Sequence, residues 1–417
     1  MPEFLQDANV TWQVYQDQDN FGDDALTSFV QYQNAPPDSP LTIHGNSFPG
    51  LEKFYSDAAA GTLPQVSWII GPAELSEHTP FTPHDGAWLQ KQIVHAVANG
   101  SSYNNTVLII SYDETGGWGD HVTPFHSPQG TPGEWLNDPY GIFGETYTGP
   151  GFRLPFYIVS PWTRGGHVFT EHADHNSQII FVEQWLEAIG YTGVQTDQMP
   201  PWRRDHMSNL LNAFDFEHPD YSLPTLADAP PPSKDSSGNY NGYALCQAQY
   251  GDPKPSAPYG PTNANLDPST LSEEGFKKVR GYLTEGRYLV FEMNGYALTN
   301  VGKNATDISA TKATAQHERA NQRWVVHATG GTATDGGEGQ GTFVIASALD
   351  GRYMASHTSF SRTRSGAETY TITDLGNGAG YTLENENGTY LTTDAGGKVG
   401  VTSKRAPWTV YSVFFHN

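Results

Sequence analysis

Short apolar runs rich in β-branched residues alternate with helical stretches over the first half of the chain. Four runs that stop at polar or glycine residues predict buried strands, namely 10–15, 65–70, 106–112 and 154–160. Stretches between and after these runs predict helices, namely 24–32, 51–60, one that Asp85 caps and that runs to 98, and 176–189. Alternation of this kind predicts an α/β fold, with a mostly parallel sheet covered by helices on both faces.

A different pattern begins after residue 270, where the chain repeats itself. Three segments share a turn, an aromatic residue and an apolar residue, as in a tight hairpin, namely 294–299, 350–355 and 387–392. Each is followed by a second strand-like segment, respectively 323–326, 369–372 and 407–410. Three strand-rich units of about forty residues predict an all-β, β-trefoil-like domain, in which each unit buries its apolar face against the others.

Gln322 and Trp324 in the first repeat resemble the QxW signature of ricin-type lectin trefoils. The other two repeats lack the glutamine. The resemblance implies contact with a polysaccharide or a membrane surface.

Residues 217–270 are rich in proline, glycine and serine and predict either a linker or an extended segment that wraps the fold. We therefore expect three regions: an α/β domain at 1–216, this linker, and the all-β domain at 271–417.

Composition excludes several classes of protein. The formal net charge of −23, without a local basic cluster, argues against a nucleic-acid-binding surface. The single cysteine, Cys246, excludes an intrachain disulfide. No apolar run reaches membrane-spanning length, and the polar, acidic residues 1–20 do not resemble a signal peptide. Because no disulfide can form within the chain, packing or a metal must stabilise the fold.

Candidate chemistry gathers where the predicted strands end. Asp113 and Glu114 directly follow the strand at 106–112 and precede Gly116 and Gly117. Ligands bind at the carboxyl ends of strands in open α/β sheets, and carboxylates are hard ligands for divalent metals. The pattern indicates a metal site, although a turn cap at Asp113 beside a solvated Glu114 is the alternative. Other acid–histidine pairs fall on the same predicted rim: Glu77-His78, Asp120-His121 and Asp174-His175.

Several motifs occur together in one order along residues 8–216. They are Trp68-Ile-Ile-Gly-Pro-Ala73 with Ser76-Glu-His78, Ser111-Tyr-Asp-Glu114 with Asp120-His-Val122, Val159-Ser-Pro-Trp162 with Arg164-Gly-Gly166, and Trp202-Arg-Arg204 with Phe214-Asp-Phe216. Together they resemble the bacterial and fungal phosphoesterase family, which contains non-haemolytic phospholipases C and a branch of acid phosphatases.

The resemblance implies an alkaline-phosphatase-like fold and hydrolysis of a phosphoester by a metal-assisted hydroxyl nucleophile. Carried onto this sequence, Asp113 and Glu114 would bind one divalent metal ion, and His78 would contact the phosphate. His175, with its neighbour Asp174, would serve as an acid–base residue. Asp120 and His121 would contact the phosphate or support the site, with a structural role in the turn as the alternative for His121. Arg164 would tie the loop after its strand, and a phosphate contact is the less favoured alternative.

One family feature has no match. Family members carry an earlier strand that ends in a Glu-Asn-Arg-Ser motif, which supplies further metal ligands, and later a serine or threonine nucleophile. We therefore expect the chain to begin in the middle of the family domain, and expect it to be inactive if nothing supplies the missing strand.

The resemblance also implies an extracellular enzyme that cleaves phospholipid head groups. Two alternatives remain open at this point: an acid phosphatase for soluble phosphomonoesters, and a non-catalytic protein that binds carbohydrate or a surface.

Overall fold

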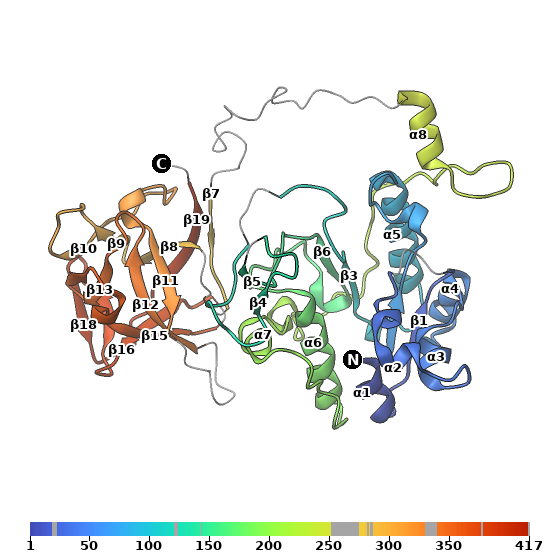
Figure 1. The fold of residues 1–417 in the computed structure, drawn as a ribbon, viewed down its shortest axis with the longest axis horizontal. Coiled ribbons are helices and arrows are strands. Elements are labelled where there is room, and N and C mark those ends of the chain that lie inside the picture. Colours follow the sequence, from blue (N-terminus) through green and yellow to red (C-terminus); the bar gives the residue numbers. More distant parts are fainter. Residues whose placement is uncertain are drawn as a thin grey trace.

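The computed structural model describes residues 1–18, 23–120, 124–142, 144–251, 275–281, 283, 287–329, 340–376 and 378–415. Helices and small sheets form the amino-terminal part, and a large sheet forms the carboxyl-terminal part beside it (Figure 1). The amino-terminal elements are α1 (Pro2–Asp7), β1 (Trp12–Tyr15), α2 (Val30–Gln33), α3 (Pro40–Gly45), α4 (Leu51–Ala60), β2 (Val66–Ile69), α5 (Pro83–Ala98), β3 (Leu108–Ser111), β4 (Trp135–Asn137), β5 (Glu145–Tyr147), β6 (Phe156–Val159), α6 (His175–Ala188) and α7 (Pro201–His206).

Strands β1 and β2 pair in parallel, and alternate side chains of β1 enter two different cores. Trp12 and Val14 pack in a core that contains Leu186 of α6. Tyr15 packs instead with Phe54 of α4 in a core that also includes residues of α5. Because successive strand residues point to opposite faces, helices cover both faces of this pair.

Strands β3 and β6 run antiparallel, with Leu108 opposite Val159 and Ser111 opposite Phe156. This arrangement differs from the expected mostly parallel sheet, since β1 and β2 form the parallel pair in the described amino-terminal part. Parallel neighbours need a crossover connection, usually a helix. The described connection from β3 to β6 contains the antiparallel β4–β5 hairpin and no α-helix, which is consistent with the reversal.

The helix predicted at 24–32 is shorter than expected. Asp24 caps a 3₁₀ turn at Ala25–Ser28 by accepting a hydrogen bond from the backbone N–H of Leu26, and α2 follows only at Val30. Helix α5 begins at Pro83, with Thr82 as its N-cap residue. Asp85, which we expected to cap α5, instead contacts Nδ1 of His84 at 2.8 Å.

The carboxyl-terminal part is a strand-rich unit with a recurring pairing scheme. The strands are β7 (Gly275–Lys278), β8 (Tyr288–Met293), β9 (Tyr296–Asn300), β10 (Ile308–Lys312), β11 (Trp324–Ala328), β12 (Gln340–Ser347), β13 (Tyr353–Ser356), β14 (Ser359–Ser361), β15 (Thr369–Asp374), β16 (Tyr381–Asn385), β17 (Tyr390–Thr393), β18 (Val399–Thr402) and β19 (Thr409–Phe414). Strands β8–β11, β12–β15 and β16–β19 form three repeats of four strands. In each repeat the first strand pairs with the second and fourth strands of the same repeat and with the fourth strand of the preceding repeat, the third repeat being the one that precedes the first.

The tryptophans of the repeats are core residues. Trp324 and Trp408 are fully buried in one apolar cluster. The indole N–H of Trp324 donates to the carbonyl of Leu298, and that of Trp408 donates to the carbonyl of Leu391, each at 2.9 Å. These matching bonds give the QxW-like tryptophan a structural role in the core.

The described part of the predicted linker wraps along α5. Lys91 binds Asp228 at 2.9 Å, and the rings of Trp88 and Tyr240 lie 6.4 Å apart. Helix α8 (Gly242–Tyr250) follows this contact. None of the described helices combines the length and the apolar character that crossing a membrane requires.

Candidate active site

Two carboxylates follow β3 in a glycine turn. Gly116 and Gly117 adopt φ angles of +61° and +81°, a region that favours glycine. The turn lets Oε1 of Glu114 accept a hydrogen bond from the backbone N–H of Gly116 at 2.8 Å. The side chain of Asp113 is exposed and has no hydrogen-bond partner among the described residues. The turn therefore orients Glu114 and leaves Asp113 open to a ligand.

His78 faces Glu114. Its Nδ1 atom lies 2.6 Å from the carbonyl oxygen of Thr79. Because a carbonyl can only accept, Nδ1 carries the proton, and Nε2 of the neutral ring holds the lone pair. Nε2 lies 3.6 Å from Oε1 of Glu114. Two acceptor atoms therefore face each other, an arrangement that suits a cation close to both atoms.

His175 approaches the same turn from α6, where it is the first helical residue. Its Nε2 atom donates to the carbonyl oxygen of Tyr112 at 2.8 Å, which leaves Nδ1 as the acceptor of the neutral ring. One helical turn later, Gln178 accepts a hydrogen bond from the hydroxyl of Ser111 at 3.2 Å. These two bonds fix the start of α6 against the end of β3.

A cleft of about 1360 Å³ joins these groups. His78, Asp113, Glu114 and His175 all line it, together with Arg153. The structure thus brings together four of the side chains that the sequence singled out.

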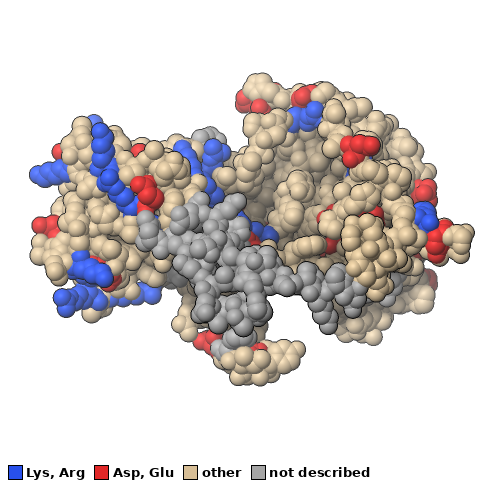
Figure 2. All heavy atoms as spheres, turned by 90° about the horizontal axis from the view of Figure 1, so that it is seen from above, with Lys and Arg blue, Asp and Glu red and all other residues tan. Residues whose placement is uncertain are grey.

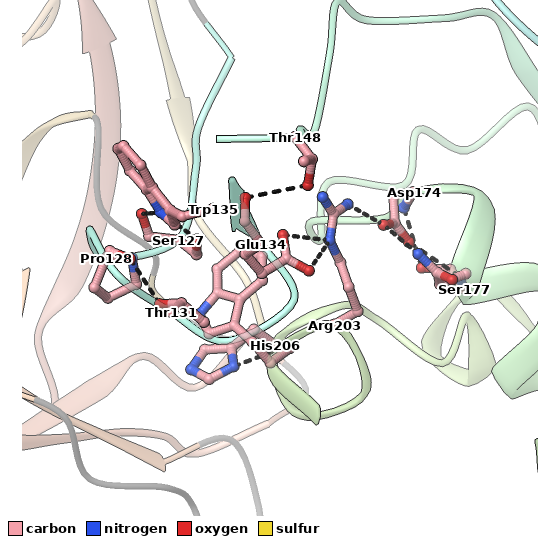
Figure 3. A network of polar contacts seen from close by, with 12 residues as sticks. Ser127, Pro128, Thr131, Glu134, Trp135, Thr148, Asp174, Ser177, Arg203 and His206 are labelled. Atoms are coloured by element: carbon pink, nitrogen blue, oxygen red, sulfur yellow. Dashed lines mark hydrogen bonds and ion pairs between the residues drawn. The ribbon is translucent and has the colours of Figure 1, made fainter. Parts of the chain in front are cut away.

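Asp174 has a structural position behind the cleft. Its carboxylate accepts from the backbone N–H of Ser177, and its own N–H donates to the Ser177 hydroxyl, forming a capping box at the start of α6. Arg203 donates to Asp174 at 2.6 Å and to both carboxylate oxygens of Glu134 at 2.9 Å (Figure 3). All three side chains are nearly buried. This network anchors the segment that carries His175.

The remaining predicted side chains lie elsewhere. Asp120 is bound by the guanidinium of Arg153, with a shortest contact of 2.8 Å, and is not among the residues that line the cleft. Arg164 donates to the hydroxyl of Ser222 at 3.2 Å and lies 3.8 Å from Asp220, so it ties the loop after β6 to the following segment. His121 lies outside the described residues.

A polar cluster beside His78 has no counterpart in the sequence analysis. Gln90 of α5 donates to Oε1 of Glu77 at 2.9 Å and to the hydroxyl of Tyr112 at 2.5 Å. Burial, and then the hydrogen bond and charge of Glu77, raise the pKa of Tyr112. The three side chains come from three separate segments, so no local sequence pattern reveals the cluster.

The described donors do not complete a metal site. Asp113 and Glu114 offer two hard carboxylate ligands, as a divalent ion requires. In the part of the chain that the structure describes, no three His, Cys, Asp or Glu side chains gather closely enough to hold an ion. The described His, Cys, Asp and Glu side chains therefore provide at most part of a coordination shell.

Comparison with known proteins agrees with the sequence resemblance. Residues 1–187 match the model of the Phosphoesterase family. A non-hemolytic phospholipase C of Pseudomonas aeruginosa is 38% identical over 252 residues, which cover 54% of this chain and 34% of that protein. A protein of the same name from Burkholderia pseudomallei is 35% identical over 281 residues, which cover 57% and 39% of the two chains.

Phospholipase C A of Mycobacterium tuberculosis is 35% identical over 236 residues, which cover 52% of this chain and 44% of that protein. Residues 1–187 are thus similar to the phosphoesterase family, as the motifs predicted. The chain covers only 34–44% of the length of these three relatives.

Proposed function

We propose that the protein is a phosphoric ester hydrolase of the phospholipase C type and that its reaction takes place in the cleft beside β3. The observation that supports the proposal is that Nε2 of His78 lies 3.6 Å from Oε1 of Glu114 in this cleft. His175 lines the same cleft. Phosphoryl transfer depends mainly on positioning and on offsetting negative charge. Imidazoles beside a carboxylate suit both needs, because an imidazole can donate or accept a proton at a fixed position.

His78 is the proposed phosphate contact. With Nδ1 held by the carbonyl of Thr79, a proton gained at Nε2 is presented to the cleft and can be donated to a phosphate oxygen. His175 is the proposed acid–base residue. Its Nε2–H is used by Tyr112, so Nδ1 exchanges the proton of the leaving alcohol. Asp174 is a positioning residue through its cap on α6.

Asp113 and Glu114 are the carboxylates that would contact a divalent ion, and its remaining ligands would be groups other than the His, Cys, Asp and Glu side chains of the described residues. Such an ion would supply charge stabilisation at the phosphate. The incomplete set of donors gives no basis for a reaction step through the ion, so the proposal rests on the histidines.

Phospholipid is the proposed substrate. The relatives are phospholipases C by name, and Trp118, an aromatic side chain on the cleft lining, is 53% exposed. An exposed apolar group at a cleft suits a ligand with an apolar portion. An extracellular location is part of the same proposal.

We also propose three regions, at 1–216, 217–270 and 271–417, with a β-trefoil-like fold for the last. The recurring strand pairing and the matched bonds of Trp324 and Trp408 support it. The surface that such a domain would contact is not proposed, because Gln322 is buried and donates to Thr311 at 2.9 Å and to the backbone of Lys312.

Hydrolysis of p-nitrophenyl phosphorylcholine and p-nitrophenyl phosphate, with and without divalent metal, tests the proposal. Asp113→Asn should lower metal-dependent turnover by about 100-fold or more, as loss of a transition-state charge contact does, and should leave folding intact. Asp38→Asn is the matched control because Asp38 is an exposed carboxylate on another segment. Equal turnover and equal metal affinity in the Asp113→Asn protein and the parent would show that Asp113 does not contribute to the site.

A further inference from the structure

Basic side chains from both parts of the chain meet where the two parts touch. The side chain of Glu171, in the segment before α6, lies 3.1 Å from the position that a Cβ atom on Gly281 would take. Next to Glu171, His172 is buried and stacks on Phe125 at 4.3 Å. The contact between Glu171 and Gly281 defines the junction of the two parts.

Lys277 of β7 and Arg287, which directly precedes β8, lie at this junction. After burial, the charges of Arg287 and Lys277 are the main causes that lower the pKa of His172. Burial, followed by the charges of Arg287 and Arg153, lowers the pKa of Lys277. Lys277 is therefore within electrostatic reach of His172, Arg287 and Arg153, and Arg153 also lines the cleft.

Arg287 is the unusual member of this group. Its Nε and Nη2 atoms are buried and have no hydrogen-bond partner among the described residues. Burial lowers its pKa to about 10. An arginine in a protein interior is normally paired, because an uncompensated buried charge is strongly unfavourable. In the part of the chain that the structure describes, the guanidinium therefore has no anionic partner.

The nearby carboxylates are engaged elsewhere. Asp120 is bound by Arg153. Glu171 accepts from a serine hydroxyl at 2.6 Å and from an asparagine amide at 2.7 Å. Asp374 accepts from the backbone N–H of Gly281 at 2.9 Å. Within the described ranges, no carboxylate forms an ion pair with Arg287.

We propose that Arg287 and Lys277 form a binding site for a phosphate group at the junction, beside the cleft that Arg153 lines. A guanidinium binds a tetrahedral oxyanion through two parallel N–H bonds, and a lysine adds a point charge. Arg287 and Lys277 each keep part of their surface exposed, so the proposed site borders solvent. Figure 2 shows lysine and arginine atoms on the side of the β-rich part that borders the hollow between the two parts.

The first test is binding of inorganic phosphate, followed by calorimetry and by the midpoint of thermal unfolding in a phosphate-free buffer with phosphate added. The parent should bind phosphate and gain thermal stability. Arg287→Met and Lys277→Gln should each weaken binding by about tenfold or more, as loss of a charge-assisted contact implies. Lys303→Gln, an exposed lysine on a different loop, should bind like the parent.

Arg287→Met also has an expected effect that separates binding from folding. Without phosphate it should unfold at the same or a higher temperature than the parent, since it removes an uncompensated buried charge. With phosphate it should gain little. An equal gain in the parent and in Arg287→Met would overturn the proposal, and so would a large loss of stability of the variant in phosphate-free buffer.

The source of the phosphate group is tested with vesicles of phosphatidylcholine, with and without phosphatidylglycerol. Binding that needs phosphatidylglycerol and is lost in Arg287→Met identifies a lipid head group, whereas phosphate binding without vesicle binding identifies a free phosphate. If the parent binds neither, the proposal is wrong. His78→Gln should retain the Arg287-dependent binding, so that failure of the proposed reaction in the cleft and failure of this site remain distinguishable.

Discussion

The side chain of Glu77 fills the space that a Cβ atom on Gly86 would occupy. Glu77 itself has a φ angle of +68°, which is uncommon for a residue with a side chain. Hydrogen bonding from Gln90 holds its carboxylate in place. His78 follows directly, so the glycine at position 86 helps to set where the imidazole enters the cleft.

We therefore expect Gly86→Ala to push Glu77 out of its position. Overpacking of this kind costs about 1–3 kcal/mol of folding free energy, and the displaced backbone should also lower turnover in the cleft. Urea unfolding and turnover measured on the same preparation test both effects. Gly302→Ala is the control, because a Cβ atom there would meet nothing within 4 Å. Equal stability of the two variants would contradict the packing argument.

Arg203 is expected to be the most costly single charge to remove behind the cleft. Arg203→Met leaves Glu134 and Asp174 buried without their cation, which costs about 3–5 kcal/mol. The free energy of unfolding in urea measures this loss. Arg362→Met, at an exposed arginine, should change the stability by less than about 0.5 kcal/mol. A small effect at Arg203 would show that the network does not stabilise the segment before α6.

His172 should make the stability of the protein depend on pH. Burial, and then the charges of Arg287 and Lys277, lower its pKa well below 6.5 in the folded state. Between that lowered value and 6.5 the unfolded chain binds more protons. Stability is therefore complete above pH 6.5 and falls below it by about 1.4 kcal/mol for each pH unit.

The measurement is the free energy of unfolding of the parent and of His172→Phe at pH 7.5, 6.5 and 5.5 in phosphate-free buffer. The free energy of unfolding of His172→Phe minus that of the parent should increase as the pH falls. A constant difference across this range would mean that His172 titrates alike in the folded and unfolded chains.

The matched indole bonds of the β-rich part give a fourth expectation. Trp324→Phe and Trp408→Phe should each leave a buried carbonyl without its donor and cost about 1–3 kcal/mol. Similar losses at both sites are expected because the two bonds have the same length and come from corresponding strands. Tyr390→Phe serves as the control, since its hydroxyl has no described hydrogen bond and no large change is expected. A large loss at only one tryptophan would argue against equivalent repeats.

Local patterns predicted the elements well where a single stretch of sequence carries the information. The apolar run at 106–112 predicted β3, and the turns that begin with Asn294, Asp350 and Asn387 predicted three hairpins. These features depend on neighbouring residues, whose periodicity and backbone preferences are visible in the sequence.

Relationships between distant segments were harder to predict. The direction of β6 relative to β3 depends on a connection of more than forty residues. Arg203 pairs with Glu134 and Asp174, which lie 69 and 29 positions away. The sequence did place Asp174 and His175 together at the start of a helix, yet it could not show that one supports the helix while the other lines the cleft.

The central claim is that the cleft beside β3 hydrolyses phosphoesters with His78 as the phosphate contact. The most direct measurement is the release of phosphorylcholine from phosphatidylcholine vesicles by the parent and by His78→Gln, with His167→Gln as a control at an exposed histidine. The account predicts turnover by the parent, a loss of about 100-fold or more in His78→Gln, and no change in the control. Equal turnover by the parent and His78→Gln, or none by a folded parent supplied with divalent metal, would contradict it.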